Sequence, residues 1–157
     1  MENHFLYVIL SGIIQGLTEF LPISSSGHLI MIKDYFNYDI QDFSFEIMLH
    51  LGTVFSILIY YYNDIKKMLK PIPENFNNAI LVIIACLPIS IFGLVFKNSI
   101  EQNFNDVSYL PYTFLITSIA LLLTKFFSGK KELNIYIVLI MGIFQILALF
   151  PGVSRSG

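Results

Sequence analysis

The sequence has little charge and few of the residues that support soluble folds or cysteine-based sites. Charged residues make up 13% of the 157 residues and hydrophobic residues 55%, whereas a soluble domain carries about 25% charged residues. This composition excludes an ordinary soluble domain and a disordered chain. The net charge of −2 provides no basic surface for nucleic acid. Tryptophan is absent, and the single cysteine, Cys86, lies in an apolar run, which excludes a disulfide framework and a cysteine-based metal site.

Arginine is almost missing as well. Eight of the nine basic residues are lysine, and Arg155 is the single arginine. Because lysine is the default cation of this chain, an arginine that remains indicates a need for the planar, two-pronged guanidinium group.

Long apolar runs are what the sequence has in abundance. Three of them match the roughly 20 residues that cross a bilayer, namely residues 43–62, 76–96 and 109–127. Two further runs are broken by proline, glycine and serine, one within residues 5–36 and one within residues 133–157. Irregular backbone cannot face lipid, so each break is predicted to line an enclosed or watery cavity. The sequence therefore predicts an all-α, polytopic membrane protein with a single domain over residues 1–157.

The two broken runs are similar to each other at a fixed offset of 130 residues. The matching positions of the first run are Gly12, Gln15, Leu17, Phe20, Ser24, Ser26 and Gly27, which recur as Gly142, Gln145, Leu147, Phe150, Ser154, Ser156 and Gly157. The polar matches are hard to attribute to composition alone. We interpret them as an internal duplication, with a first repeat over residues 1–127 and the start of a second over residues 133–157.

The charge of the connecting segments predicts the orientation of these repeats. Lysine-rich segments at residues 63–75 and 125–134 alternate with acidic ones at 33–42 and 97–108, so the positive-inside rule places the first two in the cytoplasm. With residues 5–36 taken as a re-entrant hairpin, three spans separate the two copies. The second copy then enters from the opposite face, as an inverted-topology repeat with a binding site at the repeat interface.

The polar residues in these runs suggest an anion site. The Ser24–His28 segment precedes a short apolar helix expected at residues 29–36, and serines and a glycine at a helix start can cradle an anion or simply cap the helix. Arg155 can bind the same anion bidentately, and Glu19 can act as a general acid or base, or hold a metal ion. This set suits phosphoryl transfer, in which positioning and charge stabilisation dominate.

Two further residues share a helix face. Glu46 and His50 are i,i+4 neighbours in the first predicted span. The favoured interpretation is that the two side chains form a structural hydrogen bond with each other. The alternatives are that the pair supports the site from behind or that it binds a ligand.

The motifs closely resemble a known family. Residues 15–29 resemble the first signature of the undecaprenyl-diphosphate phosphatase family, also called bacitracin resistance proteins. Residues 151–157 resemble its second signature, and residues 45–53 resemble the helix that follows the first. The resemblance implies a bacterial inner-membrane enzyme that hydrolyses undecaprenyl diphosphate to the monophosphate, recycling the lipid carrier for peptidoglycan and conferring bacitracin resistance. It also implies an inverted repeat with two re-entrant elements and an active site open to the periplasm.

The resemblance assigns roles to individual residues. The family's proposed catalytic residues correspond to Glu19, Ser25, His28 and Arg155. The resemblance implies that Ser25 is the nucleophile and that His28 is either a nucleophile or a general acid-base. It implies that Glu19 is an ionisable member of the site and that Arg155 binds the diphosphate. Its substrate-binding positions fall on Gln15, Ser24, Ser26, Gly27, Ser154 and Ser156. It implies dependence on a divalent cation, Mg²⁺ or Ca²⁺, for which Glu19 is the one candidate ligand and no dedicated site is assigned. The expected partners are a polyprenyl diphosphate lipid and the surrounding membrane lipids, with no nucleic acid.

Two other readings remain open from the sequence. Inverted repeats with broken helices are also a plan of transporters, so a lipid flippase is an alternative. The second repeat ends at residue 157, which leads us to expect a longer native enzyme and makes an inactive fragment the other alternative.

Overall fold

The computed structural model describes residues 2–38, 43–68, 73–96, 107–126 and 134–155. All regular structure in these ranges is helical, which confirms the predicted all-α class. The α-helices are α1 (Glu2–Thr18), α2 (Ser25–Tyr35), α3 (Phe43–Tyr60), α4 (Tyr62–Met68), α5 (Pro73–Val95), α7 (Leu110–Thr124) and α8 (Ile135–Phe144). Two 3₁₀ helices, η1 (Val107–Tyr109) and η2 (Gln145–Leu149), precede α7 and follow α8.

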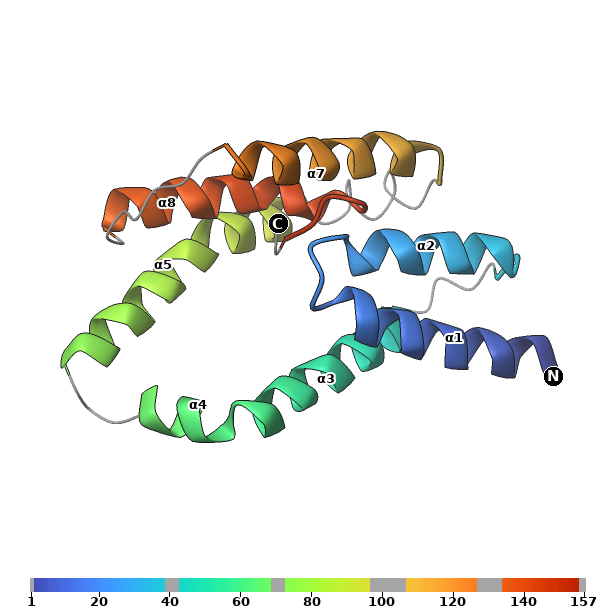
Figure 1. Ribbon diagram of the computed structural model, residues 1–157, viewed down its shortest axis with the longest axis horizontal. Coiled ribbons are helices and arrows are strands. Elements are labelled where there is room, and N and C mark those ends of the chain that lie inside the picture. The colour runs from blue at the N-terminus through green and yellow to red at the C-terminus, as the bar shows by residue number, and fades with distance from the viewer. Residues whose placement is uncertain (1, 39–42, 69–72, 97–106, 127–133, 156–157) are drawn as a thin grey trace.

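The helices enclose two loops that are far apart in the sequence (Figure 1). Helices α1 and α2 pack side by side as a hairpin, and α3 packs on α1. On the other side of the molecule, α5 packs along α8 and η2. The chain after η2 returns to the loop between α1 and α2, where the backbone N–H of Gly152 donates to Ser24 Oγ at 3.0 Å.

The interior of this fold is unusually polar and its surface unusually apolar. Among the described residues, the buried polar side chains are Ser11, Gln15, Thr18, Ser24, Thr53 and Thr117. The buried hydrophobic residues are Tyr7, Leu29, Ile30, Leu110 and Val138, while large apolar side chains cover the outside of every long helix. Small and polar residues between helices, with apolar residues outside, are typical of a chain whose solvent is lipid.

The predicted spans coincide with helices of this structure. Residues 43–62 correspond to α3, residues 76–96 to α5, which contains Pro88, and residues 109–127 to α7. By length and hydropathy, Val107–Thr124 is the one helix of the described residues that can cross a membrane unaided, and Ser44–Tyr60 and Ala79–Val95 are shorter apolar helices. That α3 and α5 each cross the membrane therefore stays a prediction.

Two helix boundaries differ from the sequence-based expectation. The helix expected at residues 29–36 begins at Ser25, because Ser24 caps it by accepting a hydrogen bond from the Gly27 N–H. The expected cytoplasmic segment at 63–75 contains α4, in which Lys67 and Asp64 form an i,i+3 ion pair at 3.0 Å. Residues 39–42, 69–72, 97–106 and 127–133, which supply much of the charge in the predicted topology, lie outside the described residues.

Candidate active site

The site begins at the C-terminal end of α1, whose buried face is polar. Gln15 is 1% exposed, and Glu19 follows the last turn, with its backbone N–H bonded to the Gln15 carbonyl at 3.0 Å. The spacing of four residues places both side chains on one face of the helix. The Gln15 amide donates to Glu19 Oε2 at 3.0 Å, so the helix itself fixes where this carboxylate points.

Ser25 completes a short contact with the same carboxylate. It is the first residue of α2, and its hydroxyl donates to Glu19 Oε2 at 2.6 Å. A charge-assisted bond of this length is strong. Because the hydroxyl hydrogen is directed at Glu19, the lone pairs of Ser25 Oγ are left for an electrophile. A hydroxyl hydrogen-bonded to a carboxylate is the arrangement that the predicted roles of Ser25 and Glu19 require.

His50 reaches this cluster from α3. Its Nδ1 atom lies 2.9 Å from Gln15 Nε2 and 3.6 Å from Glu19 Oε2. The favoured pairing of His50 with Glu46 is absent among the contacts of the described residues, and Glu46 is exposed. The packing of α3 on α1 explains this difference, because it turns the His50 ring toward another helix.

Ser24 connects the two loops. It adopts a positive φ of 64°, is 6% exposed, and accepts from the N–H groups of Gly27 at 3.4 Å and Gly152 at 3.0 Å. With both lone pairs accepting, its own hydrogen is available to Ser26 Oγ, 3.3 Å away. The Ser26 hydroxyl hydrogen is then free to point elsewhere.

His28 lies one turn into α2. Its Nδ1 donates to the Ser24 carbonyl at 2.7 Å, and its ring packs edge-on against Phe114 of α7. In the neutral ring this leaves Nε2 as an acceptor. The structure thus fixes the orientation of the His28 ring without using the nitrogen that can exchange a proton.

The second loop is held by α7 and by close backbone approach. Thr117 Oγ1 donates to the Gly152 carbonyl at 2.9 Å and accepts from the Ser154 N–H at 3.0 Å. Gly152 has φ +91°, a conformation that favours glycine, and a Cβ there would collide with Thr113. A Cβ on Gly27 would in turn lie 3.0 Å from Gly152 Cα, so the loops meet where neither carries a side chain.

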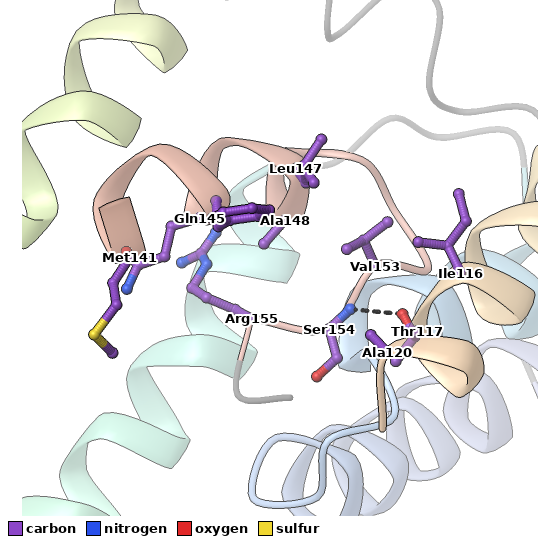
Figure 2. A pocket seen from close by; sticks show the side chains of 11 residues that line it. Ile116, Thr117, Ala120, Met141, Gln145, Leu147, Ala148, Val153, Ser154 and Arg155 are labelled. Atoms are coloured by element: carbon purple, nitrogen blue, oxygen red, sulfur yellow. Dashed lines mark hydrogen bonds between the residues drawn. The ribbon is translucent and has the colours of Figure 1, made fainter. Parts of the chain in front are cut away.

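Arg155 lies beyond this contact, on a pocket of about 270 Å³ between α7, α8 and η2. Gln145, Ser154 and Thr117 supply the other polar groups of an otherwise apolar lining. Figure 2 shows the guanidinium extending toward Gln145 and Ala148, and the Ser154 N–H bonded to Thr117. Arg155 is exposed.

The structure brings some of the predicted site residues together and separates others. Gln15, Glu19 and Ser25 form one hydrogen-bonded cluster, with Ser24, Ser26, Gly27 and His28 on the adjoining turn. Among the described residues, Arg155 makes no hydrogen bond or ion pair with that cluster. Ser156 lies outside the described residues. The assigned roles of all these residues stay predictions.

Sequence reasoning did not single out two residues of the site, Thr117 and Phe114, which it included only in a predicted span. For His50 it kept a supporting position behind the site as an alternative, but it favoured Glu46 as the partner. The hydroxyl of Thr117 inside an apolar run is a sequence feature that could have indicated a polar contact. No feature of the sequence indicates that Phe114 lies next to His28.

The described residues do not form a dedicated metal site. They contain no group of three or more His, Cys, Asp or Glu side chains placed to hold an ion. Glu19 Oε2 already accepts from Ser25 and Gln15. We therefore derive no chemical step through a divalent cation.

Comparison with known proteins identifies a family to which this chain is similar over most of its length. A family model described as bacitracin resistance protein BacA matches residues 8–157. The undecaprenyl-diphosphatase of Thermosipho africanus is 40% identical over 158 residues, covering 95% of this chain and 62% of the relative. That of Thermotoga petrophila is 37% identical with the same coverage, and undecaprenyl-diphosphatase 1 of Shouchella clausii is 34% identical, covering 97% of this chain and 61% of the relative. The chain thus spans about three fifths of the length of these relatives.

Proposed function

The chain belongs to the bacitracin resistance protein BacA family, a family of membrane proteins, and on that premise we propose that it hydrolyses undecaprenyl diphosphate. The products are undecaprenyl phosphate and inorganic phosphate, so the reaction recycles a lipid carrier for bacterial cell-wall synthesis. The names of the relatives support this substrate. The observation that carries the proposal is the 2.6 Å hydrogen bond from Ser25 to Glu19.

The first half-reaction is a phosphoryl transfer to Ser25. Its Oγ attacks the terminal phosphorus, Glu19 accepts the hydroxyl proton, and the bond to the bridging oxygen breaks. Undecaprenyl phosphate leaves with that bond's electron pair and takes up the proton from Glu19, which restores the carboxylate for the second half-reaction. His28 is the other candidate for the proton transfer, because its Nε2 is left as an acceptor.

The second half-reaction consumes water. Glu19 takes a proton from a water molecule, whose oxygen attacks the phosphoserine, and inorganic phosphate leaves as Ser25 Oγ regains a proton. Charge builds up on the phosphoryl oxygens in both steps. The N–H groups of Ser25 and Ser26 at the start of α2, the Ser26 hydroxyl and Arg155 are the groups proposed to stabilise it.

The placement of this site in the membrane is part of the proposal. We propose an inverted repeat with two re-entrant elements, a bacterial inner-membrane location, and a site open to the periplasm. The sequence duplication and the contact between Ser24 and Gly152 support it. The contact joins the two loops that carry the duplicated serines, which is what a shared site at a repeat interface requires. Arg155 lies three residues past Gly152 and has no partner among the described residues, so its flexible side chain can serve the same anion.

The test measures phosphate release from a polyprenyl diphosphate by the purified chain in detergent. We expect Glu19→Gln, Ser25→Ala, His28→Ala and Arg155→Ala each to lower the rate, with about 10²–10³ lost for one charge-stabilising group. Ser56→Ala is the control, because its exposed hydroxyl bonds only to the Gly52 carbonyl of its own helix. Near-normal activity of Glu19→Gln or Arg155→Ala would contradict the assignment, and proteoliposome transport without phosphate release would favour the transporter alternative.

A further inference from the structure

His50 contacts the polar cluster, and the proposed reaction assigns it no task. It belongs to α3, whereas Gln15 and Glu19 belong to the end of α1. Its Nδ1 approaches Gln15 Nε2 to 2.9 Å, within hydrogen-bond range, and Glu19 Oε2 only to 3.6 Å. The contact to Gln15 is therefore the one to explain.

The donors and acceptors of this contact can be counted. An amide nitrogen carries two hydrogens, and Gln15 Nε2 has two neighbours, Glu19 Oε2 at 3.0 Å and His50 Nδ1 at 2.9 Å. The carboxylate takes one hydrogen, and His50 Nδ1 takes the other only if it carries no proton. This assigns to His50 the neutral tautomer protonated at Nε2. The reverse orientation of the amide would set Gln15 Oε1 against the Glu19 carboxylate.

Burial makes this arrangement costly to change. Gln15 is 1% exposed, so water cannot replace a lost acceptor at its amide nitrogen. The His50 side chain is 44% exposed, which lets its Nε2–H reach a partner outside the cluster. The backbone carbonyl of His50 accepts from Thr53 Oγ1 at 2.8 Å.

We propose that His50 is a positioning residue for the Ser25–Glu19 pair. It acts through Gln15: its Nδ1 accepts one amide hydrogen, which holds the other on Glu19 Oε2, the oxygen that receives the Ser25 hydroxyl. A chain of three hydrogen bonds therefore transmits the position of α3 to the proposed nucleophile. The inference rests on the proposed function only where it predicts that His50 variants release phosphate more slowly. The hydrogen bonds of His50 can be observed without any measurement of activity.

The kinetic test compares two replacements of His50. Phe fills the same space without an acceptor, whereas the Oδ1 of Asn can take the place of Nδ1. We expect His50→Phe to lower kcat about 10–100-fold, the range found for partners that orient the ligands of a metal. KM should be unchanged, because His50 does not touch the substrate. His50→Asn restores most of kcat. Gln15→Leu together with His50→Phe is no worse than Gln15→Leu alone, since both break one chain of contacts.

Glu46→Gln is the matched control. Glu46 lies one turn before His50 on α3 and is exposed, so kcat stays at the parental value. Parental kcat in His50→Phe, or His50→Asn no better than His50→Phe, would overturn the proposal.

A spectroscopic readout separates this proposal from the proposed function. In the ¹⁵N-histidine-labelled chain in detergent, we expect the signal lost in His50→Phe to show a protonated Nε2 and a hydrogen-bonded, unprotonated Nδ1. Gln15→Leu abolishes that hydrogen-bond signature. A His50 protonated at Nδ1, or a signal indifferent to Gln15→Leu, refutes the positioning role. If the chain releases no phosphate, the proposed function is contradicted, but the spectrum still shows whether His50 Nδ1 accepts a hydrogen bond from Gln15.

Discussion

Thr117 holds the second loop through two hydrogen bonds of one side chain. Its hydroxyl donates to the Gly152 carbonyl and accepts from the Ser154 N–H, and its side chain is 6% exposed. One side chain of α7 thus satisfies two backbone groups of an irregular segment. Irregular backbone inside a membrane protein persists only where such partners exist.

Replacing Thr117 by valine, which has nearly the same shape, should therefore destabilise the chain. Removing a buried partner and leaving backbone groups unsatisfied costs about 1–3 kcal/mol. We expect a lower apparent Tm of the purified chain in detergent. Ser118→Ala is the control, because this exposed neighbour bonds only to the Phe114 carbonyl of its own helix. Equal Tm values for the two variants would show that Thr117 does not hold the loop.

The local half of the site was predictable at this scale and the long-range half was not. Gln15 and Glu19 are four residues apart, so helical periodicity alone places them together. Ser25 follows six residues later, across a loop that the break at Pro22 already marks. His50 and Thr117 join the site through the packing of α3 on α1 and of α7 on the second loop. The sequences around His50 and Thr117 do not indicate these contacts, and for His50 the i,i+4 spacing on the helix favours Glu46 as the partner instead.

At the scale of elements, the packing of α5 along α8 includes a close backbone approach at Gly142. A Cβ on Gly142 would lie 2.6 Å from the Ala85 carbonyl oxygen and 3.0 Å from Pro88 Cγ. Gly12, which matches Gly142 at the sequence offset of 130 residues, has open space at the same point. The two similar segments therefore pack differently, and the small residue forms a helix contact in α8 but not in α1.

Alanine substitution of these two glycines should separate packing from helix propensity. Gly142→Ala overpacks the contact of α8 with α5, at a cost of about 1–3 kcal/mol. Gly12→Ala gains helix propensity, worth up to about 1 kcal/mol, without a clash. We expect SDS titration of the folded chain to show an earlier midpoint for Gly142→Ala and an unchanged or later one for Gly12→Ala. The same shift in both variants would contradict the close approach.

Helix existence was easier to predict than helix limits. Each apolar run of the sequence forms a helix, because in lipid only a helix pairs the backbone N–H and C=O groups of such a run within the run itself. The start of α2 was predicted four residues late, since Ser24 caps the helix from a position with positive φ, which the sequence does not reveal. Helix α4 lies beyond the end of the apolar run and contains the exposed i,i+3 ion pair of Lys67 with Asp64.

For the molecule as a whole, the apolar exterior indicates where the lipid lies. Val82, Ile83 and Leu87 of α5 are exposed, and so is Cys86 between them. An exposed apolar surface of this kind marks a contact with a membrane or with other protein, and in a membrane-protein family lipid is the contact expected first. The lysine-bearing helix α4 lies at one end of α3, which gives the proposed orientation a cytoplasmic marker.

Thiol labelling in vesicles tests both the lipid contact and the orientation. A charged maleimide reacts with a hydrated thiolate, so native Cys86 should stay unlabelled until SDS unfolds the chain. In a Cys86→Ser background, Lys66→Cys on α4 should be labelled only in inside-out vesicles, and Tyr35→Cys at the end of α2 only in right-side-out vesicles. Both positions are exposed in the structure, so either thiol reacts wherever it meets water. The opposite pattern would reverse the proposed orientation and place the site toward the cytoplasm, and labelling of Cys86 in intact vesicles would show that α5 does not face lipid.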